Sequence, residues 1–341
     1  MKKFFVLIFG FLTYISPAFA ETIRISIGTQ DTTINCAVGG LLVRELGLLE
    51  KYLPRDGKYK DVVYDVEWSN YTSGPPLTAG MVAGKIDIGN MGEFPAFKNI
   101  VAFGALGKKS IVIAALSESH TGGGNGIVVP ASSSVTSVKD LKGKTISVPI
   151  GSSAHGMLLR ALEENGLTVD DVTIINQSPE IAGTALKVGR VDAHADFVPF
   201  AELFPFRGFA RKIYDGSQSK IPTFHAALAD ESFAKKYPEL VVAYLRAAIE
   251  ANALISENPE KYSKLIAEKT GIDYPVVRMY YGKDQIQERN LAISKEDRFA
   301  LANAQDTLRK LGLYTAQVID IDSVIDDSFI KKALALSHVK K

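Results

Sequence analysis

The segment TIRISIG at residues 22–28 is the first strand pattern of the chain, and the spacing of the patterns after it decides the fold class. Its apolar and polar residues alternate and it ends in glycine, which is typical of a β-strand. Comparable patterns occur at residues 62–68, 86–89, 110–116, 126–129, 145–148, 172–175 and 193–197. Helical spacing separates many of them, at residues 37–52, 77–83, 154–165 and 181–189. Strands that alternate with helices indicate parallel pairing through crossover helices, and therefore an α/β fold.

The C-terminal part of the chain indicates how the fold divides into two lobes. From Glu231 onward almost every segment has helical spacing, with long candidates at residues 237–256, 259–270 and 295–311. This tail needs a sheet to pack on, and the first α/β unit offers one. A second unit begins near Pro130. We therefore expect two lobes, each a mostly parallel sheet flanked by helices, joined by a two-strand hinge. The first lobe comprises residues 21–122 and 225–341, and the second comprises residues 123–224.

Composition excludes several classes of protein. The chain has 341 residues, of which 46% are hydrophobic, so enough apolar surface is available to offset the entropy of folding. With 39 basic and 38 acidic residues it lacks the positive surplus of a nucleic-acid-binding protein, and we expect no nucleic-acid partner. Cys36 is the single cysteine, which excludes a disulfide framework and a metal site made of several cysteines.

Residues 1–20 have the pattern of an export signal. Lys2 and Lys3 precede an apolar stretch at residues 4–15, and residues 18–20 (AFA) form a small-x-small cleavage site. Cleavage there leaves 37 basic and 38 acidic side chains, a net charge of −1. No later segment reaches the roughly 18 consecutive apolar residues of a membrane span. We expect a mature protein in the periplasm.

Polar loops follow several of the predicted strands. They lie at residues 30–33, 69–75, 90–93, 151–155 and 194–197. In open parallel sheets, ligands bind beyond the carboxyl ends of the strands, where loops and helix N-termini point. We expect these loops to meet in a cleft between the lobes.

Several blocks of sequence resemble the aliphatic-sulfonate, taurine and nitrate type of periplasmic binding protein, the NMT1/THI5-like family. They are residues 69–89, with a GPPL core and an AGKIDIG ending, 138–144 (VKDLKGK), 151–155 (GSSAH) with 158–162 (LLRAL), 189–193 (GRVDA) and 233–258. The resemblance covers nearly the whole chain after residue 20. It implies a type II two-lobed binding protein that closes on a small solute and delivers it to the permease and ATPase of an ABC importer. It also implies a monomer with peripheral membrane contact only, without catalysis, cofactor or metal.

Carried over by position, the family's ligand pocket corresponds to Gln30, Ser73, Glu93 and residues 152–155. Two departures stand out. Sulfonate-binding members usually have a Trp-rich segment where this chain has residues 194–197 (HADF), and the Lys that often follows the Gln is replaced by Asp31. Both differences remove features that suit a plain anion.

The candidate ligand-binding residues fall into three chemical groups. The helix start at residues 151–155 offers free N–H groups to an anion, although Ser152 or Ser153 could act only as an N-cap. The carboxylates of Asp31, Glu93 and Asp196 could hold an ammonium or a neutral polar group, or could be solvated rim residues. Aromatic side chains could pack on the solute's apolar part. The full set is Gln30, Asp31, Thr32, Tyr71, Ser73, Gly74, Asn90, Glu93, Phe94, Ser152, Ser153, His155, His194, Asp196 and Phe197.

Other functions have weaker support. Ser153 and His155 lack the G-x-S-x-G pattern of a nucleophile elbow, and residues 122–126 (GGGNG) lack the spacing of a phosphate loop. Three scattered candidates, His155, His194 and Asp196, make a weak metal signal. We expect a binding protein for a small polar solute such as an alkanesulfonate or taurine. The alternatives are a nitrogen-containing neutral or zwitterionic solute (a thiamine pyrimidine precursor, a urea-like or an amino compound) and an enzyme of the pyrimidine-precursor type.

Overall fold

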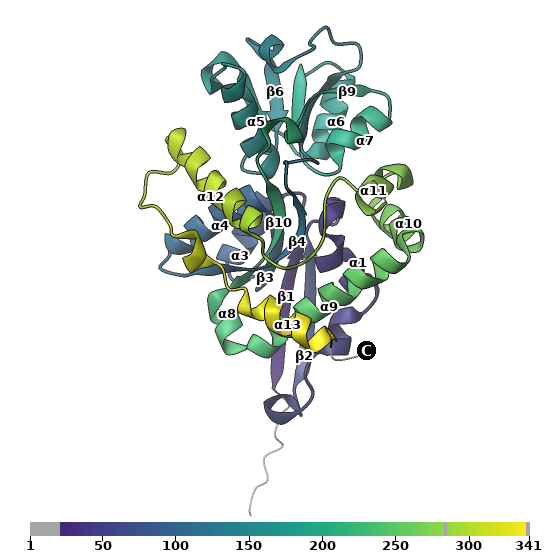
Figure 1. Ribbon diagram of the computed structural model, residues 1–341, viewed down its shortest axis with the longest axis vertical. Coiled ribbons are helices and arrows are strands. Elements are labelled where there is room, and N and C mark those ends of the chain that lie inside the picture. The colour runs from purple at the N-terminus through teal and green to yellow at the C-terminus, as the bar shows by residue number, and fades with distance from the viewer. Residues whose placement is uncertain (1–20, 283–284, 339–341) are drawn as a thin grey trace, which may run out of the picture.

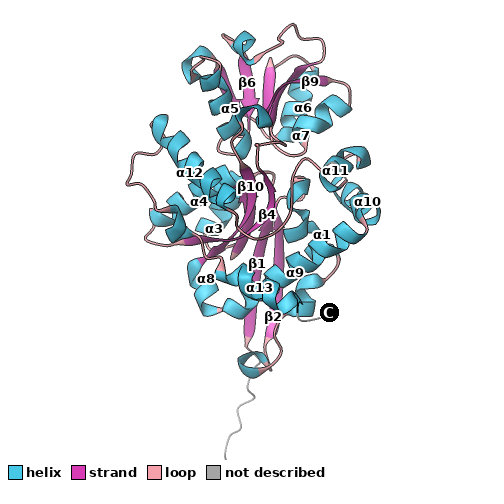
Figure 2. Cartoon of the chain, in the orientation of Figure 1, coloured by secondary structure: helices cyan, strands magenta, loops and turns pink. Residues whose placement is uncertain are grey.

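A computed structural model describes residues 21–282 and 285–338 and has two lobes, each built on a five-stranded sheet with flanking helices (Figures 1 and 2). The predicted two-lobed α/β fold is therefore confirmed. The predicted export signal at residues 1–20 lies outside the described residues. Within the described ranges, no helix is both long and apolar enough to cross a membrane.

The first sheet defines lobe I and has the strand order β2-β1-β3-β10-β4. Its strands are β1 (Thr22–Thr29), β2 (Val63–Asn70), β3 (Ile88–Gly92), β4 (Ser110–Ser119) and β10 (Thr223–Asp230). Strand β1 pairs in parallel with β2 and β3, whereas β10 is antiparallel to both β3 and β4. One reversed strand therefore lies within an otherwise parallel sheet.

The second sheet defines lobe II and has the order β7-β6-β8-β5-β9. Its strands are β5 (Gly126–Pro130), β6 (Thr145–Val148), β7 (Thr173–Asn176), β8 (Ala193–Asp196) and β9 (Ala210–Asp215). Strand β6 pairs in parallel with β7 and β8, and β5 is the reversed strand. The chain enters lobe II between β4 and β5 and returns between β9 and β10.

Helices cover both sheets. Lobe II carries α5 (Ser153–Glu164), α6 (Pro179–Lys187) and α7 (Phe200–Phe206). Lobe I carries α1 (Leu41–Glu45), α2 (Leu48–Tyr52), α3 (Gly74–Val82), α4 (Glu93–Gly104), α8 (Glu231–Lys236), α9 (Pro238–Glu257), α10 (Pro259–Thr270), α11 (Tyr274–Tyr281), α12 (Lys295–Lys310) and α13 (Ser328–His338). Short 3₁₀ turns are η1 (Ile34–Gly39), η2 (Gly57–Tyr59), η3 (Val138–Leu141), η4 (Val169–Asp171), η5 (Gly216–Ser219) and η6 (Ile321–Val324). The C-terminal helices pack on lobe I, and α9 contacts both α2 and α13.

The segment predicted as one helix at residues 37–52 is broken into η1, α1 and α2. Gly39 lies so close to the sheet that a Cβ atom there would be 2.6 Å from a methyl carbon of Leu116. Gly47 has a left-handed backbone with φ of 60°, which ends α1 and starts α2. The single-helix prediction was wrong because the apolar spacing continues across both breaks. The elements that were not predicted include strands β9 and β10 and helices α4 and α7.

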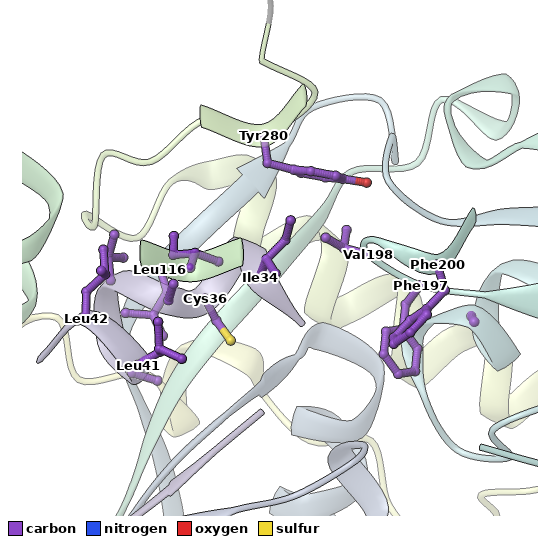
Figure 3. Packing of buried hydrophobic residues seen from close by; sticks show 14 of the residues in the cluster. Ile34, Cys36, Leu41, Leu42, Leu116, Phe197, Val198, Phe200 and Tyr280 are labelled. Carbon is purple, nitrogen blue, oxygen red and sulfur yellow. The ribbon is translucent and has the colours of Figure 1, made fainter. Parts of the chain in front are cut away.

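The apolar core continues from one lobe into the other. Figure 3 shows Cys36 and Leu116 of lobe I on one side and Phe197 and Phe200 of lobe II on the other. These residues belong to one cluster of buried hydrophobic side chains. Packing therefore joins the lobes in addition to the two crossing segments.

Candidate functional site

A cavity lies between the lobes, at the carboxyl ends of strands from both sheets. It encloses about 400 Å³ of empty space, within the range of small-molecule sites. Each of the five loops named in the sequence analysis contributes at least one residue to its wall. The lining residues are Gln30, Thr33, Asn35, Gly74, Gly92, Glu93, Pro95, Asn125, Ser152, Ser153, Phe197, Val198, Thr223, Phe224, His225 and Gln287.

Three helices begin at the cavity wall. Helix α3 starts at Gly74, α4 at Glu93 and α5 at Ser153, and each follows a strand of its sheet. The first N–H groups of a helix have no partner within it, and the helix dipole places partial positive charge there. Part of this capacity is used in α5, since the Ser152 hydroxyl accepts a hydrogen bond from the His155 backbone N–H at 3.4 Å. Pro75 and Pro76 in α3 and Pro95 in α4 have no N–H, which reduces the donors at these two helix starts. The N–H groups of Gly74 and Ser153 remain to suit an anionic group.

Buried polar atoms without a partner gather at the same cavity. Five lining side chains, each at most 6% exposed, have a polar atom that makes no hydrogen bond to the protein. They are Thr33 Oγ1, Asn35 Oδ1, Glu93 Oε1, Thr223 Oγ1 and His225 Nε2. Burying such a group without a partner costs roughly 1–3 kcal/mol. Five of them around one space therefore indicate a site built to bind a polar molecule.

Among the described lining residues, Glu93 is the one acidic residue. Its Oε2 accepts a hydrogen bond from the Ser153 hydroxyl at 3.1 Å, which links the starts of α4 and α5 across the two lobes. Burial raises the pKa of Glu93, and the positive charge of Arg160 opposes this shift. Among the described lining residues there is neither a lysine nor an arginine.

Two histidines near the cavity are uncharged at neutral pH. Burial lowers the pKa of His225 to about 4, and its Nε2 is one of the partnerless atoms. Burial is the main cause that lowers the pKa of His155 to about 4, and the positive charge of Lys98 contributes to the same shift. The His155 ring accepts a hydrogen bond from the Gly151 N–H at 3.2 Å and meets the Phe94 ring edge-on, with 6.1 Å between ring centroids. His155 therefore holds the loop before α5 in place.

Six of the predicted site residues line the cavity, and nine do not. The six are Gln30, Gly74, Glu93, Ser152, Ser153 and Phe197. The other nine are Asp31, Thr32, Tyr71, Ser73, Asn90, Phe94, His155, His194 and Asp196.

Several of the nine support residues that do line it. Ser73 is the residue before α3, and Tyr71 and Phe94 belong to the apolar packing of lobe I. The Asn90 carbonyl accepts a hydrogen bond from the Gln30 side chain at 2.8 Å, and its side-chain amide donates to the Gly39 carbonyl at 2.9 Å. These contacts orient Gln30 toward the cavity.

Asp31 points away from the cavity because it has partners within its own lobe. It forms an ion pair with Arg44 at 3.0 Å and accepts a hydrogen bond from the Thr29 hydroxyl at 2.8 Å. Its neighbour Thr32 is only partly buried. The carboxylate of Asp31 therefore stabilises the turn after β1.

His194 and Asp196 pair with each other inside lobe II. Both side chains are 0% exposed, and His194 Nε2 lies 2.7 Å from Asp196 Oδ2. The other ring nitrogen of His194 contacts Ser147. Burial raises the pKa of Asp196 and the nearby His194 opposes the shift. Because β8 lies between β6 and β5 and is buried along its whole length, these side chains face the core of lobe II.

Most of the additional lining residues come from segments that carry no local motif. Thr223, Phe224 and His225 begin the returning strand β10, and Asn35 lies in η1. Gln287 belongs to the C-terminal tail and is 252 residues from Asn35 in the sequence. The side-chain amide of Asn35 donates a hydrogen bond to the Gln287 side chain at 2.6 Å. Thr223 and His225 are polar residues within the otherwise apolar start of β10, and they were the one sequence feature that could have indicated a site there.

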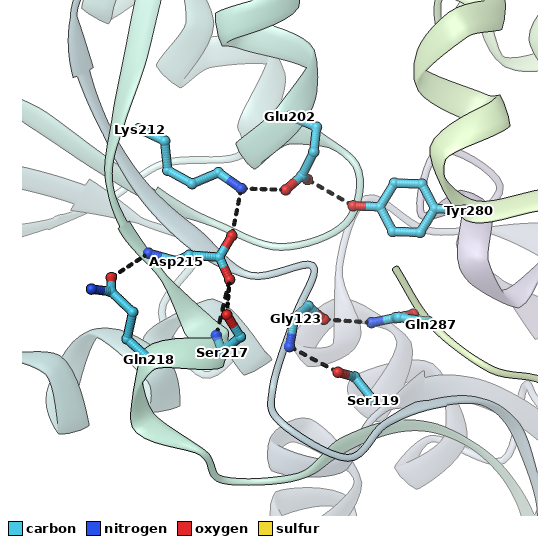
Figure 4. Close-up of polar contacts among 9 residues, drawn as sticks. All are labelled: Ser119, Gly123, Glu202, Lys212, Asp215, Ser217, Gln218, Tyr280 and Gln287. Carbon is cyan, nitrogen blue, oxygen red and sulfur yellow. Dashed lines mark hydrogen bonds and ion pairs between the residues drawn. The ribbon is translucent and has the colours of Figure 1, made fainter. Parts of the chain in front are cut away.

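A second contact between the lobes lies beside α7 and α11 (Figure 4). The Tyr280 hydroxyl of lobe I donates a hydrogen bond to Glu202 Oε2 of lobe II at 2.7 Å. Glu202 also pairs with Lys212, which in turn pairs with Asp215 at 2.8 Å. Figure 4 also shows Gln287 donating to the Gly123 carbonyl, at 3.0 Å, where the chain enters lobe II.

Within the described ranges, one group has the geometry to hold a cation. Glu118, His120 and Glu288 place one ligand atom each within 4.8 Å of one another, and none of the three lines the cavity. Glu118 is buried and already accepts hydrogen bonds from Asn290 and Ser294. We assign this group to the packing of the tail against β4.

Comparison with known proteins gave consistent results. A model of the NMT1/THI5 like family matches residues 96–262. The "Putative aliphatic sulfonates-binding protein" of Bacillus subtilis is 30% identical over 300 residues, which cover 86% of this chain and 84% of that protein. The taurine-binding periplasmic protein of Escherichia coli is 29% identical over 202 residues, 58% of this chain and 60% of that protein. The alkanesulfonate-binding protein SsuA from Xanthomonas axonopodis pv. citri, solved bound to MOPS, superposes with a TM-score of 0.74 at 25% identity, covering 90% of this chain and 99% of that one.

Proposed function

The chain belongs to the NMT1/THI5-like family and is related over most of its length to aliphatic sulfonates-binding proteins, and from this premise we propose that it is the solute-binding protein of an ABC importer for a small organosulfonate. The observation that carries the proposal is the cavity between the lobes, where three helix N-termini and five partnerless polar atoms meet.

The sulfonate group is held by neutral donors in this proposal. The donors available to it are the backbone N–H groups of Gly74 at the start of α3 and of Ser153 at the start of α5, together with the hydroxyl of Ser152. The described lining residues include no lysine or arginine. Helix N-termini stabilise anions in this way without a lysine or arginine. Closure of the lobes replaces the solute's hydration shell with these fixed hydrogen bonds.

The cellular setting follows from the same relationship. We place the mature protein in the periplasm as a monomer, with the signal at residues 1–20 removed, and assign it a membrane permease and an ATPase as partners. We propose lobe boundaries at residues 21–122 with 225–341 for the first lobe and residues 123–224 for the second, although β10 of the first sheet already begins at Thr223. Cys36 supports a role without catalysis, because its thiol donates to the carbonyls of Gln30 and Thr33 and burial raises its pKa, which keeps it from acting as a nucleophile.

Calorimetry on the mature protein tests the function. The titrants are ethanesulfonate, butanesulfonate, taurine and MOPS, with nitrate, urea and a pyrimidine precursor of thiamine as competitors from the alternative functions. We expect saturable binding of at least one sulfonate and a rise in its melting temperature by mass action. Binding of the pyrimidine precursor or urea without any sulfonate would overturn the proposal, as would covalent turnover of a solute detected by NMR.

A further inference from the structure

Glu93 places a carboxyl group in the cavity wall, and when this group is ionised it disfavours a simple sulfonate. It is 3% exposed, and its Oε1 has no hydrogen-bond partner among the described residues. An ionised carboxylate repels an anion placed beside it, and a buried one is stable only when it is paired. Arg160 acts on Glu93 through its field, yet makes neither an ion pair nor a hydrogen bond with it in the described structure. The carboxylate therefore lacks a cation at the cavity.

Asn35 adds a second acceptor whose orientation is determined by its neighbours. The Gln287 amide nitrogen donates to the Gly123 carbonyl at 3.0 Å, so its oxygen is the atom that faces Asn35. The Asn35 amide nitrogen donates to that oxygen at 2.6 Å. Oδ1 of Asn35 is therefore left as a buried acceptor without a donor.

Two buried acceptors at one cavity require hydrogen-bond donors from the solute. Sulfonate oxygens only accept hydrogen bonds and cannot satisfy either of them. An ammonium group has three donors and a positive charge, which match Glu93 Oε1 and Asn35 Oδ1. The hydroxyl oxygens of Thr33 and Thr223, which also have no hydrogen-bond partner among the described residues, can accept a third hydrogen bond from the ammonium group.

We propose that Glu93 and Asn35 select a solute that carries an ammonium group in addition to its sulfonate, so that the site takes an aminoalkanesulfonate in preference to an unsubstituted alkanesulfonate. The proposal rests on the proposed function, since it concerns the second end of the same solute. The sulfonate lies toward Gly74 and Ser152, and the ammonium lies toward Glu93 and Asn35.

The test compares taurine with ethanesulfonate, which has the same carbon chain without the amine. Calorimetry is carried out on the mature protein, on Glu93→Gln and on the control Glu67→Gln, which changes a half-exposed glutamate of β2. Glutamine keeps an oxygen that can accept the Ser153 hydroxyl but loses the charge. We expect wild type and control to prefer taurine, and Glu93→Gln to lose about tenfold or more of its taurine affinity while holding ethanesulfonate at least as tightly as wild type.

A pH series on wild type gives a readout that a purely structural role of Glu93 would not move. Protonation of Glu93 removes the partner of the ammonium and the repulsion of the sulfonate. Taurine should therefore bind more weakly as pH falls through the pKa of Glu93, while ethanesulfonate should bind more tightly. The series stays well above pH 4, because burial lowers the pKa of His225 and of His155 to about 4 and their protonation would attract either sulfonate. This arm remains informative if Glu93→Gln fails to fold.

The outcomes separate this proposal from the function on which it rests. Equal wild-type affinity for the two solutes, equal losses for both in Glu93→Gln, or parallel pH profiles would overturn the selection of an ammonium group while leaving sulfonate binding intact. Absence of binding by either solute would overturn the proposed function itself.

Discussion

Removal of one hydroxyl at the contact between α7 and α11 tests whether the lobes must close to hold the solute. Tyr280→Phe deletes the hydrogen bond from lobe I to Glu202 of lobe II, whose length is 2.7 Å. Burial raises the pKa of Glu202, and the charge of Lys212 opposes this shift. The carboxylate of Glu202 keeps its ion pair with Lys212 in the variant, so only the hydrogen bond from Tyr280 is lost.

The expected size of the effect follows from the chemistry of this bond. A hydrogen bond to a charged group contributes about 1.5–3 kcal/mol. If the bond exists only when the lobes are closed, its loss reduces the free energy of closure by that amount. The lower value alone corresponds to an increase of about tenfold in Kd for the solute.

The assay is calorimetry of Tyr280→Phe beside a control on the same helix, Tyr274→Phe. Among the described residues the Tyr274 hydroxyl makes no hydrogen bond, and its ring contacts Lys264. We expect weaker binding in the first variant, unchanged binding in the second, and a similar melting temperature for both without solute. A Kd for Tyr280→Phe within twofold of wild type would refute the idea that this contact stabilises the closed form.

Three further predictions concern the site and the core. Ser153→Ala removes one hydrogen bond at the cavity and should weaken solute binding about fivefold in calorimetry; unchanged affinity would exclude this helix start from the site. Asp196→Ala leaves buried His194 without its carboxylate and should lower the free energy of unfolding by about 3 kcal/mol in urea titrations, and a loss below 1 kcal/mol would contradict the pairing. Gly39→Ala should destabilise by about 1–3 kcal/mol through overpacking, whereas Gly104→Ala, where a Cβ meets no atom within 4 Å, should not; equal effects would disprove the close approach.

The alternation of strands and helices was predictable because each signal is local. Residues 22–28 and 62–68 became β1 and β2 with small changes at their ends, and the loops after them meet at one cavity. The breaks near Gly39 and Gly47 were not predictable, since they depend on how closely η1 approaches Leu116, a residue of another strand.

The candidate site was predictable only where residues follow a strand directly. Glu93 and Ser153 were predicted in this way, and both line the cavity. His194 and Asp196 follow the same period-two pattern as side chains at a cleft, but β8 is buried on both faces and the pattern does not distinguish the two environments. His225 and Gln287 reach the cavity through the returning strand and the tail, and contacts between segments so distant leave no local signal.

The position of β10 has a consequence for the order in which the chain can fold. Strand β10 lies between β3 and β4, although lobe II separates it from them in the sequence. Until residues 223–230 have been synthesised, β3 and β4 each present an unpaired edge, and lobe I stays incomplete. Lobe II, whose strands come from one continuous stretch, has no such requirement. Lobe I pairings span long sequence separations and carry the larger loop-closure entropy, so we expect lobe II to form first and lobe I to set the folding rate.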